Sequence, residues 1–176
     1  ELVQPGESPR PDQIIASNTY GLAAMVEAEG GEARLLPIAR DTREALAQAL
    51  DLADGADLVV TVGGASVGDH DLVGEVLGKH GSRAFYKVAM RPGKPLMAGR
   101  IGNAAMLGLP GNPVSSLVCG HVFLLPMLRA MQGLPAEPAP RRKAALAAPL
   151  GPNGPREHYM RARVSAAGVA AFDRQD

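Results

Sequence analysis

DLVVTVGGASVGDHD, at residues 57–71, joins a continuous apolar run to a glycine-rich loop. An apolar run without polar alternation predicts a parallel strand at the centre of its sheet, covered by helices on both faces. The glycines that follow allow backbone N–H groups to turn inward around an anion such as phosphate. Residues 63–71, here called the glycine loop, match neither the Walker loop nor the dinucleotide fingerprint. A plain strand-to-helix turn capped by Asp69 or Asp71 therefore stays open as the alternative.

Helical and strand periodicities alternate on both sides of this stretch. They predict strands at residues 14–16, 33–38, 57–62, 84–89, 96–101 and 104–109, and helices at residues 19–29, 41–53, 72–79 and 113–131. Gly102-Asn103 predicts a hairpin turn, and Pro126 predicts a kink or break in the last helix. The alternation as a whole predicts an α/β fold with a doubly wound, mostly parallel sheet.

Composition divides the chain into four predicted parts. Residues 1–12 are a Pro-rich lead-in, residues 13–133 the α/β domain, and residues 134–140 a linker rich in Pro and Ala. Residues 141–176 are expected to start a small all-β module that is cut short. Because the chain begins without Met, inside what reads as an extended segment, we expect it to be a fragment of a longer protein.

Composition also excludes several classes of protein. The chain has 18 Lys and Arg against 18 Asp and Glu, so a general attraction to nucleic acid or to anionic membrane is not expected. We expect no apolar run to reach the roughly 18 residues that a bilayer span requires. The single cysteine, Cys119, excludes an intramolecular disulfide. Together these features predict a cytoplasmic protein with neither a nucleic-acid nor a membrane partner.

Two further loops carry groups suited to anions. The cationic loop, Arg91–Pro95, holds Arg91 and Lys94 on a chain stiffened by proline, which suits a small oxyanion. In the asparagine loop, Leu109–Ser116, free N–H groups at the start of a helix and the Ser115 hydroxyl are placed for an anionic ligand. The alternatives that stay open are a solvated turn for the cationic loop and a cap-assisting hydroxyl for Ser115.

Asp41 stands at the head of the second predicted helix. The order Asp41-Thr42-Arg43-Glu44 has the pattern of a capping box, with Glu44 placed to reach back to the cap. That pattern favours Asp41 as the N-cap over Asp41 as a catalytic or metal-binding carboxylate, although the sequence does not separate the two.

The loop motifs, taken together and in this order, resemble those of the MoeA family of molybdopterin molybdenumtransferases, to which the gephyrin E domain is similar. They are Gly-Gly-x-Ser-x-Gly-x-x-Asp at 63–71, Pro-Gly-Lys-Pro at 92–95 and Leu-Pro-Gly-Asn-Pro-Val-Ser at 109–115. The resemblance extends to Ser17-Asn18 after the first strand and to Gln132-Gly133 after the long helix. It implies that residues 13–133 are a molybdopterin-binding domain of MoaB/MogA-like fold.

The resemblance also implies a reaction and a set of site residues. Molybdate would be inserted into adenylylated molybdopterin with release of AMP, giving active molybdenum cofactor with the help of Mg²⁺. The implied catalytic acids are Asp71, Asp41 and Glu1, of which the first two would also hold the metal. Molybdopterin contacts are implied at Gly63, Gly64, Ser66, Gly68, Pro110, Gly111, Asn112 and Pro113, and molybdate contacts at Arg91, Lys94, Pro95, Ser115 and Arg161.

Partners follow from the same resemblance. It implies a homodimer of the full-length protein and a MogA-type partner enzyme. Two alternatives stay open: a MogA-type molybdopterin adenylyltransferase, and a binding or scaffold module similar to gephyrin. The Pro-Gly-Lys-Pro loop and the trailing β module speak against the first alternative. Two residues depart from the family pattern: Arg91 stands where the family often has Lys, and Leu72 stands where it often has Tyr. Arginine in place of lysine keeps the charge but alters its geometry.

Overall fold

The computed structural model describes residues 2–3, 6, 8–12, 14–64, 73–74, 78 and 81–175. Four of the predicted site residues, Glu1, Ser66, Gly68 and Asp71, lie outside the described residues, as does most of the helix predicted over 72–79. The structure therefore bears on the start of the glycine loop, on the other two loops and on the C-terminal module.

A four-stranded sheet forms the centre of the fold. It consists of β3 (Leu58–Val62), β7 (Ala104–Leu109), β6 (Met97–Ile101) and β4 (Gly81–Tyr86), in the order β3-β7-β6-β4. The β3–β7 pair is parallel, whereas β7–β6 and β6–β4 are antiparallel. The α/β class is confirmed, with a sheet that is mixed in the described part of the chain. The hairpin between β6 and β7 turns at Gly102, whose φ is 53°, as predicted.

β3 was expected at the centre of its sheet, and it lies at one end of the described four-stranded order. The reason is that residues 31–40, which were predicted to contain a strand at 33–38, adopt neither helix nor strand. Leu35 is 46% exposed and Leu36 packs toward the core, an alternation that matches a strand. Pro37, however, has no N–H for a ladder bond, and no described strand pairs with this segment.

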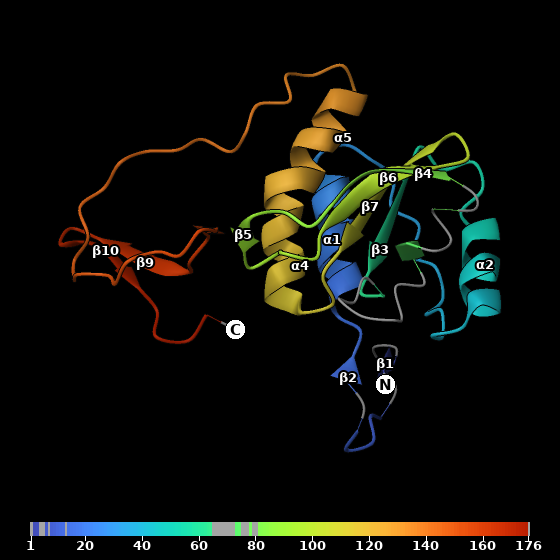
Figure 1. The fold of residues 1–176 in the computed structure, drawn as a ribbon, viewed down its shortest axis with the longest axis horizontal. Helices are drawn as coiled ribbons and strands as arrows, with labels where there is room; N and C mark the ends of the chain where they lie inside the picture. Colours follow the sequence, from blue (N-terminus) through green and yellow to red (C-terminus); the bar gives the residue numbers. More distant parts are fainter. Residues whose placement is uncertain are drawn as a thin grey trace.

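Helices cover both faces of the sheet (Figure 1). On one face lie α1 (Asn18–Ala28) and a long helical segment made of α4 (Pro113–Cys119), η1 (Gly120–Leu124) and α5 (Leu125–Met131). On the other face lies α2 (Arg43–Asp51). Gly30, with a φ of 83°, follows α1 as the sequence predicts. This arrangement is the doubly wound one expected from the alternating pattern.

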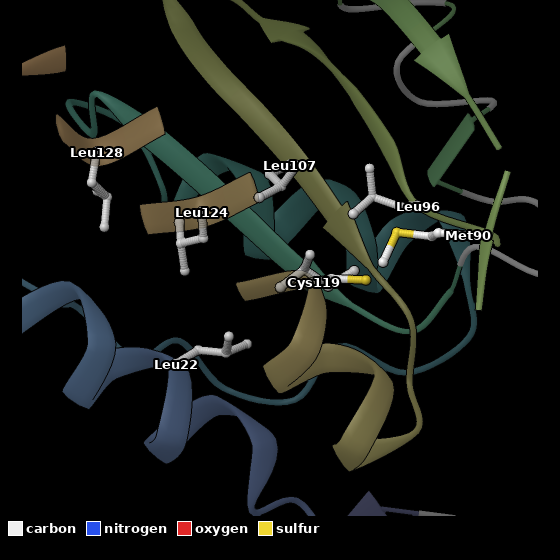
Figure 2. Close-up of a cluster of buried hydrophobic side chains, with 8 residues drawn as sticks. Leu22, Met90, Leu96, Leu107, Cys119, Leu124 and Leu128 are labelled. Carbon is white, nitrogen blue, oxygen red and sulfur yellow. The ribbon is translucent and has the colours of Figure 1, made fainter. Parts of the chain in front are cut away.

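The two faces of the sheet have separate hydrophobic cores. Figure 2 shows the larger one, where Leu22 of α1 and Leu124 of η1 meet Leu107 of β7. Its buried members are Leu22, Met90, Leu96, Leu107, Leu109, Cys119, Leu124 and Leu128. The smaller core, beneath α2, is built from Ala53, Val59, Val73, Met97, Ala104 and Met106. Side chains alternate along a strand, so neighbouring residues of β3 face opposite cores. Val59 faces the smaller core, whereas Leu58 and Val60 face the larger one.

The long helical segment changes geometry in its middle. η1 is a π-helical turn in which the N–H of Leu125 donates to the carbonyl of Gly120. Pro126 follows this turn at the second position of α5. Pro126 was predicted to kink or break the helix; instead the helix continues through it to Met131, and the wider turn just before the proline accommodates its missing N–H.

The same segment corrects the expectation that no apolar run reaches the length of a bilayer span. Pro113–Met131 is a helix of 19 residues with a mean hydropathy of 1.5, long and apolar enough by those two measures. Leu124 and Cys119 are fully buried, and the segment packs on α1 and β7. Its buried side chains, Cys119, Leu124 and Leu128, belong to the larger hydrophobic core of the α/β domain.

The C-terminal part has short strands only. β9 (Ala162–Ser165) and β10 (Gly168–Ala171) form an antiparallel pair that lies apart from the α/β layers (Figure 1). The all-β module was expected from residue 141 on, but within residues 141–150 the structure shows a single bridge, from Leu146 to Val169. β8 (Glu157–His158) pairs in parallel with β5 (Met90–Arg91), which attaches this part to the cationic loop. A further parallel pair joins β1 (Leu2–Val3) to β2 (Ile14–Ile15).

Candidate ligand-binding site

The glycine loop and the asparagine loop touch where β3 and β7 end. These strands are parallel neighbours, and the N–H of Gly63 donates to the carbonyl of Leu109 at 2.9 Å. A Cβ added to Gly111 would lie 3.5 Å from the Cα of Gly63, so two backbones approach closely. Gly63 and Gly64 have φ values of 81° and 71°, which glycine adopts without strain. The two loops thus meet at the carboxyl edge of the sheet, where doubly wound folds bind ligands.

The asparagine loop caps α4 with its own side chains. Asn112 is the N-cap, and its Oδ1 accepts from the Ser115 N–H at 3.0 Å and from the Ser115 hydroxyl at 3.3 Å. Pro113 takes the first helical position, where proline is favoured. The cap-assisting role that stayed open for Ser115 is therefore observed, and a contact of Ser115 with molybdate stays a prediction.

Two residues that the sequence did not single out for function hold this loop from behind. The Ser116 hydroxyl, fully buried, contacts the carbonyls of Pro110 and Asn112, the latter at 3.1 Å. The Asn18 side-chain amide donates to the carbonyl of Gly111 at 2.7 Å and to the Ser116 hydroxyl at 3.3 Å. The Ser17-Asn18 motif at the head of the first helix is the one sequence feature that points to Asn18. Nothing near this motif in the sequence indicates that Asn18 bonds Gly111, 93 residues away.

The cationic loop is fixed by packing around one glycine. Gly93 is buried with a φ of 114°, and a Cβ there would lie 2.6 Å from the sulfur of Cys119 and 3.0 Å from that of Met90. The peptide bond between Arg91 and Pro92 is cis. On the inner side, the carbonyl of Lys94 accepts from Val88 N–H at 3.1 Å. The loop backbone is therefore tightly constrained although its ends carry exposed cations.

Those cations, Arg91 and Lys94, are exposed and form no ion pair within the part of the chain that the structure describes. Cys119 contacts the loop at Gly93, and Ser115 lies four residues earlier on α4, hence on the same face of the helix. The cationic loop and the first turn of α4 are thus presented on one side of the molecule. Burial raises the pKa of the Cys119 thiol to about 12, so this sulfur stays protonated and packs as an apolar group.

Lys87 is a cation that the sequence did not single out. It is the one described non-glycine residue with a positive φ, 66°, and it sits between β4 and the cationic loop. Its N–H donates to the carbonyl of Leu96 at 2.9 Å, and its ammonium lies 4.8 Å from the centre of the Tyr86 ring. Its left-handed backbone was not predictable, because lysine rarely adopts it.

Asp41 is not the helix cap. Thr42 occupies that position in α2, and its hydroxyl accepts from Ala45 N–H at 3.2 Å. The capping box predicted from Asp41 to Glu44 was wrong by one residue, because Thr and Asp are both good caps and the helix starts after the threonine. Asp41 itself is exposed.

No group of three or more metal-ligating side chains gathers among the described residues. Of the two carboxylates implied for Mg²⁺, Asp41 is exposed and Asp71 lies outside the described residues.

Arg161 forms hydrogen bonds within the C-terminal module. It precedes β9, and its guanidinium donates to the carbonyl of Arg174 at 2.9 Å, within the C-terminal module. The module does reach the cationic loop through another segment, because Tyr159 N–H donates to the carbonyl of Arg91 at 2.7 Å. Arg141 forms an exposed ion pair with Glu157 at 2.8 Å, next to the β8 strand that carries Glu157.

A groove also lies at the opposite end of the sheet. It is lined by α2, by residues 53–57 before β3 and by the turn between β6 and β7. None of the predicted site residues borders it. It lies at the amino end of β3, whereas parallel strands of this class present ligand loops at their carboxyl ends.

A sheet covered by helices on both faces, with glycine-rich loops meeting at the carboxyl ends of two parallel strands, defines an α/β ligand-binding domain. The profile of the family described as "Probable molybdopterin binding domain" matches residues 1–130. The chain belongs to this family.

Two curated relatives extend the comparison. A molybdopterin molybdenumtransferase 2 of Mycobacterium tuberculosis is 40% identical over 165 residues, which cover 89% of this chain and 41% of the relative. A molybdopterin molybdenumtransferase of Nostoc sp. is 40% identical over 139 residues, covering 76% and 32%.

A solved structure agrees with them. That of the molybdopterin biosynthesis MoeA protein from Pyrococcus horikosii superposes with a TM-score of 0.80 at 28% identity, covering 99% of this chain and 43% of that one. The chain thus spans about two fifths of the length of the first relative and of this structure.

Proposed function

We propose that this chain is the molybdopterin-binding core of a molybdopterin molybdenumtransferase, which inserts molybdate into adenylylated molybdopterin and releases AMP. The observation that carries the proposal is the meeting of the glycine and asparagine loops beside two exposed cations without ion-pair partners in the described residues. The names of relatives at 40% identity support it.

The chemistry of the loops suits these substrates. Molybdate and the phosphates of adenylylated molybdopterin are anions, and cationic side chains with backbone N–H groups bind such anions through charge-assisted hydrogen bonds. Arg91 and Lys94 supply the charge on a loop that Gly93 holds in place. Gly63 and Gly111 let the two loops pack backbone against backbone beside the N–H groups at the start of α4. The binding of both substrates is the part of the reaction that these residues serve.

The proposal assigns Mg²⁺ to Asp71 and Asp41, because hard divalent cations prefer carboxylate oxygens. The proposal further includes a homodimer of the full-length protein, a MogA-type partner enzyme and a cytoplasmic location. These rest on the family resemblance.

The test measures AMP release by the full-length protein supplied with adenylylated molybdopterin, molybdate and Mg²⁺. Wild type is expected to release AMP in a molybdate-dependent manner, and Asp71→Ala to lower the rate at least about a hundredfold, as loss of a general acid–base or metal-binding group does. Asp69→Ala, two residues away in the same loop, is the matched control.

Two outcomes would contradict the proposal. Absence of AMP release from wild type would reject the transferase function, and equal rates in the two aspartate variants would remove Asp71 from the mechanism. ATP-dependent adenylylation of free molybdopterin would instead identify a MogA-type enzyme.

A further inference from the structure

We propose that Asn18 is a positioning residue of the ligand site, which orients backbone N–H groups of the asparagine loop toward the anionic ligand. The inference rests on the proposed function and names a residue to which neither the loop motifs nor the family resemblance gives a role. Its starting point is that three successive carbonyls of the loop, those of Pro110, Gly111 and Asn112, are all held from one side.

The holding groups are Asn18 and Ser116. The Asn18 amide donates to Gly111 O at 2.7 Å, and the Ser116 hydroxyl donates to the carbonyl of Pro110. Asn18 also donates to Ser116 Oγ at 3.3 Å. Asn18 therefore holds the Gly111 carbonyl directly, and it also orients the Ser116 hydroxyl, which bonds the Pro110 carbonyl. Ser116 is fully buried and Asn18 half-buried, which places both behind the loop.

The orientation of the N–H groups follows from peptide geometry. In a trans peptide the C=O and the N–H of the next residue point in opposite directions. The cis bond of the described chain lies at Arg91-Pro92, so the peptides after Pro110 and Gly111 are trans. Holding these two carbonyls inward therefore turns the N–H groups of Gly111 and Asn112 outward. Neither N–H has a hydrogen-bond partner among the described residues.

Asn18 does not serve its own helix. α1 begins at Asn18 with Ser17 as its N-cap, and no side chain bonds the cap there. The amide of Asn18 instead reaches across to a loop 93 residues further along the chain.

The experiment compares Asn18→Asp with Asn153→Asp in the full-length protein. Both replace an amide that donates to a backbone carbonyl, at 2.7 Å for Asn18 and 3.0 Å for Asn153, but Asn153 lies in the C-terminal module. A carboxylate at residue 18 repels the Gly111 carbonyl. We expect the KM for adenylylated molybdopterin to rise about tenfold in Asn18→Asp, the loss of one charge-assisted hydrogen bond, with kcat changed by less than about twofold. Asn153→Asp should leave both unchanged.

A second measurement separates this inference from the proposed function. Selective ¹⁵N labelling of Gly and Asn follows the amide resonances of Gly111 and Asn112 without any substrate, and Asn18→Asp should shift both. If Asn18→Asp does not fold, Ser116→Ala should shift the Gly111 resonance by the same route. An unchanged KM, or resonances that do not move, would overturn the positioning role. Absence of AMP release from wild type would reject the proposed function, and the resonances alone would then decide the role of Asn18.

Discussion

The asparagine loop uses its polar side chains in internal hydrogen bonds, whereas the cationic loop leaves its charged side chains without partners in the described residues. In the first, Asn112, Ser115 and Ser116 bond one another and the backbone. In the second, the backbone is held by the packing of Gly93 on two sulfur atoms, and Arg91 and Lys94 extend outward. The difference indicates that one loop gives the site its shape and the other gives it charge. Substitutions should therefore separate stability from binding.

The largest expected effect is at Gly93. In Gly93→Ala the added methyl group would lie 2.6 Å from the sulfur of Cys119, on a backbone with a φ of 114°. Overpacking together with the unfavourable backbone should cost about 3 kcal/mol of stability. Gly102→Ala is the control, because Gly102 also has a positive φ, 53°, but open space around it, so only about 1 kcal/mol should be lost. Urea unfolding of the full-length variants measures both. Equal losses would show that the sulfur contacts do not fix the cationic loop.

A smaller effect, on binding alone, is expected at Lys94. Lys94→Met keeps the length of the side chain and removes its charge, so the affinity for molybdate should fall about tenfold, the loss of one charge-assisted contact. Stability should change by less than about 0.5 kcal/mol, because Lys94 is exposed and makes no ion pair in the described part of the protein. Titration calorimetry with molybdate gives the affinity, and Lys143→Met, in an exposed segment, is the control. A loss of stability without a loss of affinity would reverse the roles assigned to the loops.

The smallest expected effect tests the same contrast in two adjacent residues of α2. Thr42 caps the helix and Asp41 does not, so Thr42→Ala should cost about 1 kcal/mol while Asp41→Asn costs less than about 0.5 kcal/mol. Thermal unfolding distinguishes them. If Asp41→Asn lowers AMP release without lowering stability, Asp41 serves the reaction. A larger stability loss from Asp41→Asn than from Thr42→Ala would restore Asp41 as the cap.

The features predictable from sequence are those fixed by residues close together in the chain. The strand before Gly63, the hairpin at Gly102 and the irregular helix geometry next to Pro126 all follow from local residue types. The prediction of a strand at 33–38 was wrong, because a strand also needs a neighbouring strand to pair with. The sequence of the segment itself does not show whether such a partner exists.

The cap of α2 was misplaced by one residue for a different reason, since Asp41 and Thr42 are both competent caps and only the start of the helix distinguishes them.

In the site, the loops themselves were predictable, whereas their support was not. The bond from Asn18 to Gly111 and the contact of Gly93 with Cys119 join residues distant in sequence, and no local pattern marks either. Lys87 was missed because its significance lies in a backbone angle that lysine seldom adopts.

The π-helical turn at Gly120–Leu124 has a consequence for helical phase. In an α-helix successive residues are rotated by about 100°, so Leu124 would point roughly 140° away from Cys119, five residues earlier. Both side chains nevertheless belong to the same core, because the wider turn absorbs one extra residue before the α-helix resumes. Leu128, four residues on, then continues the same stripe. The turn thus acts as a phase correction that keeps the buried face of the helix continuous from Cys119 through Leu124 to Leu128.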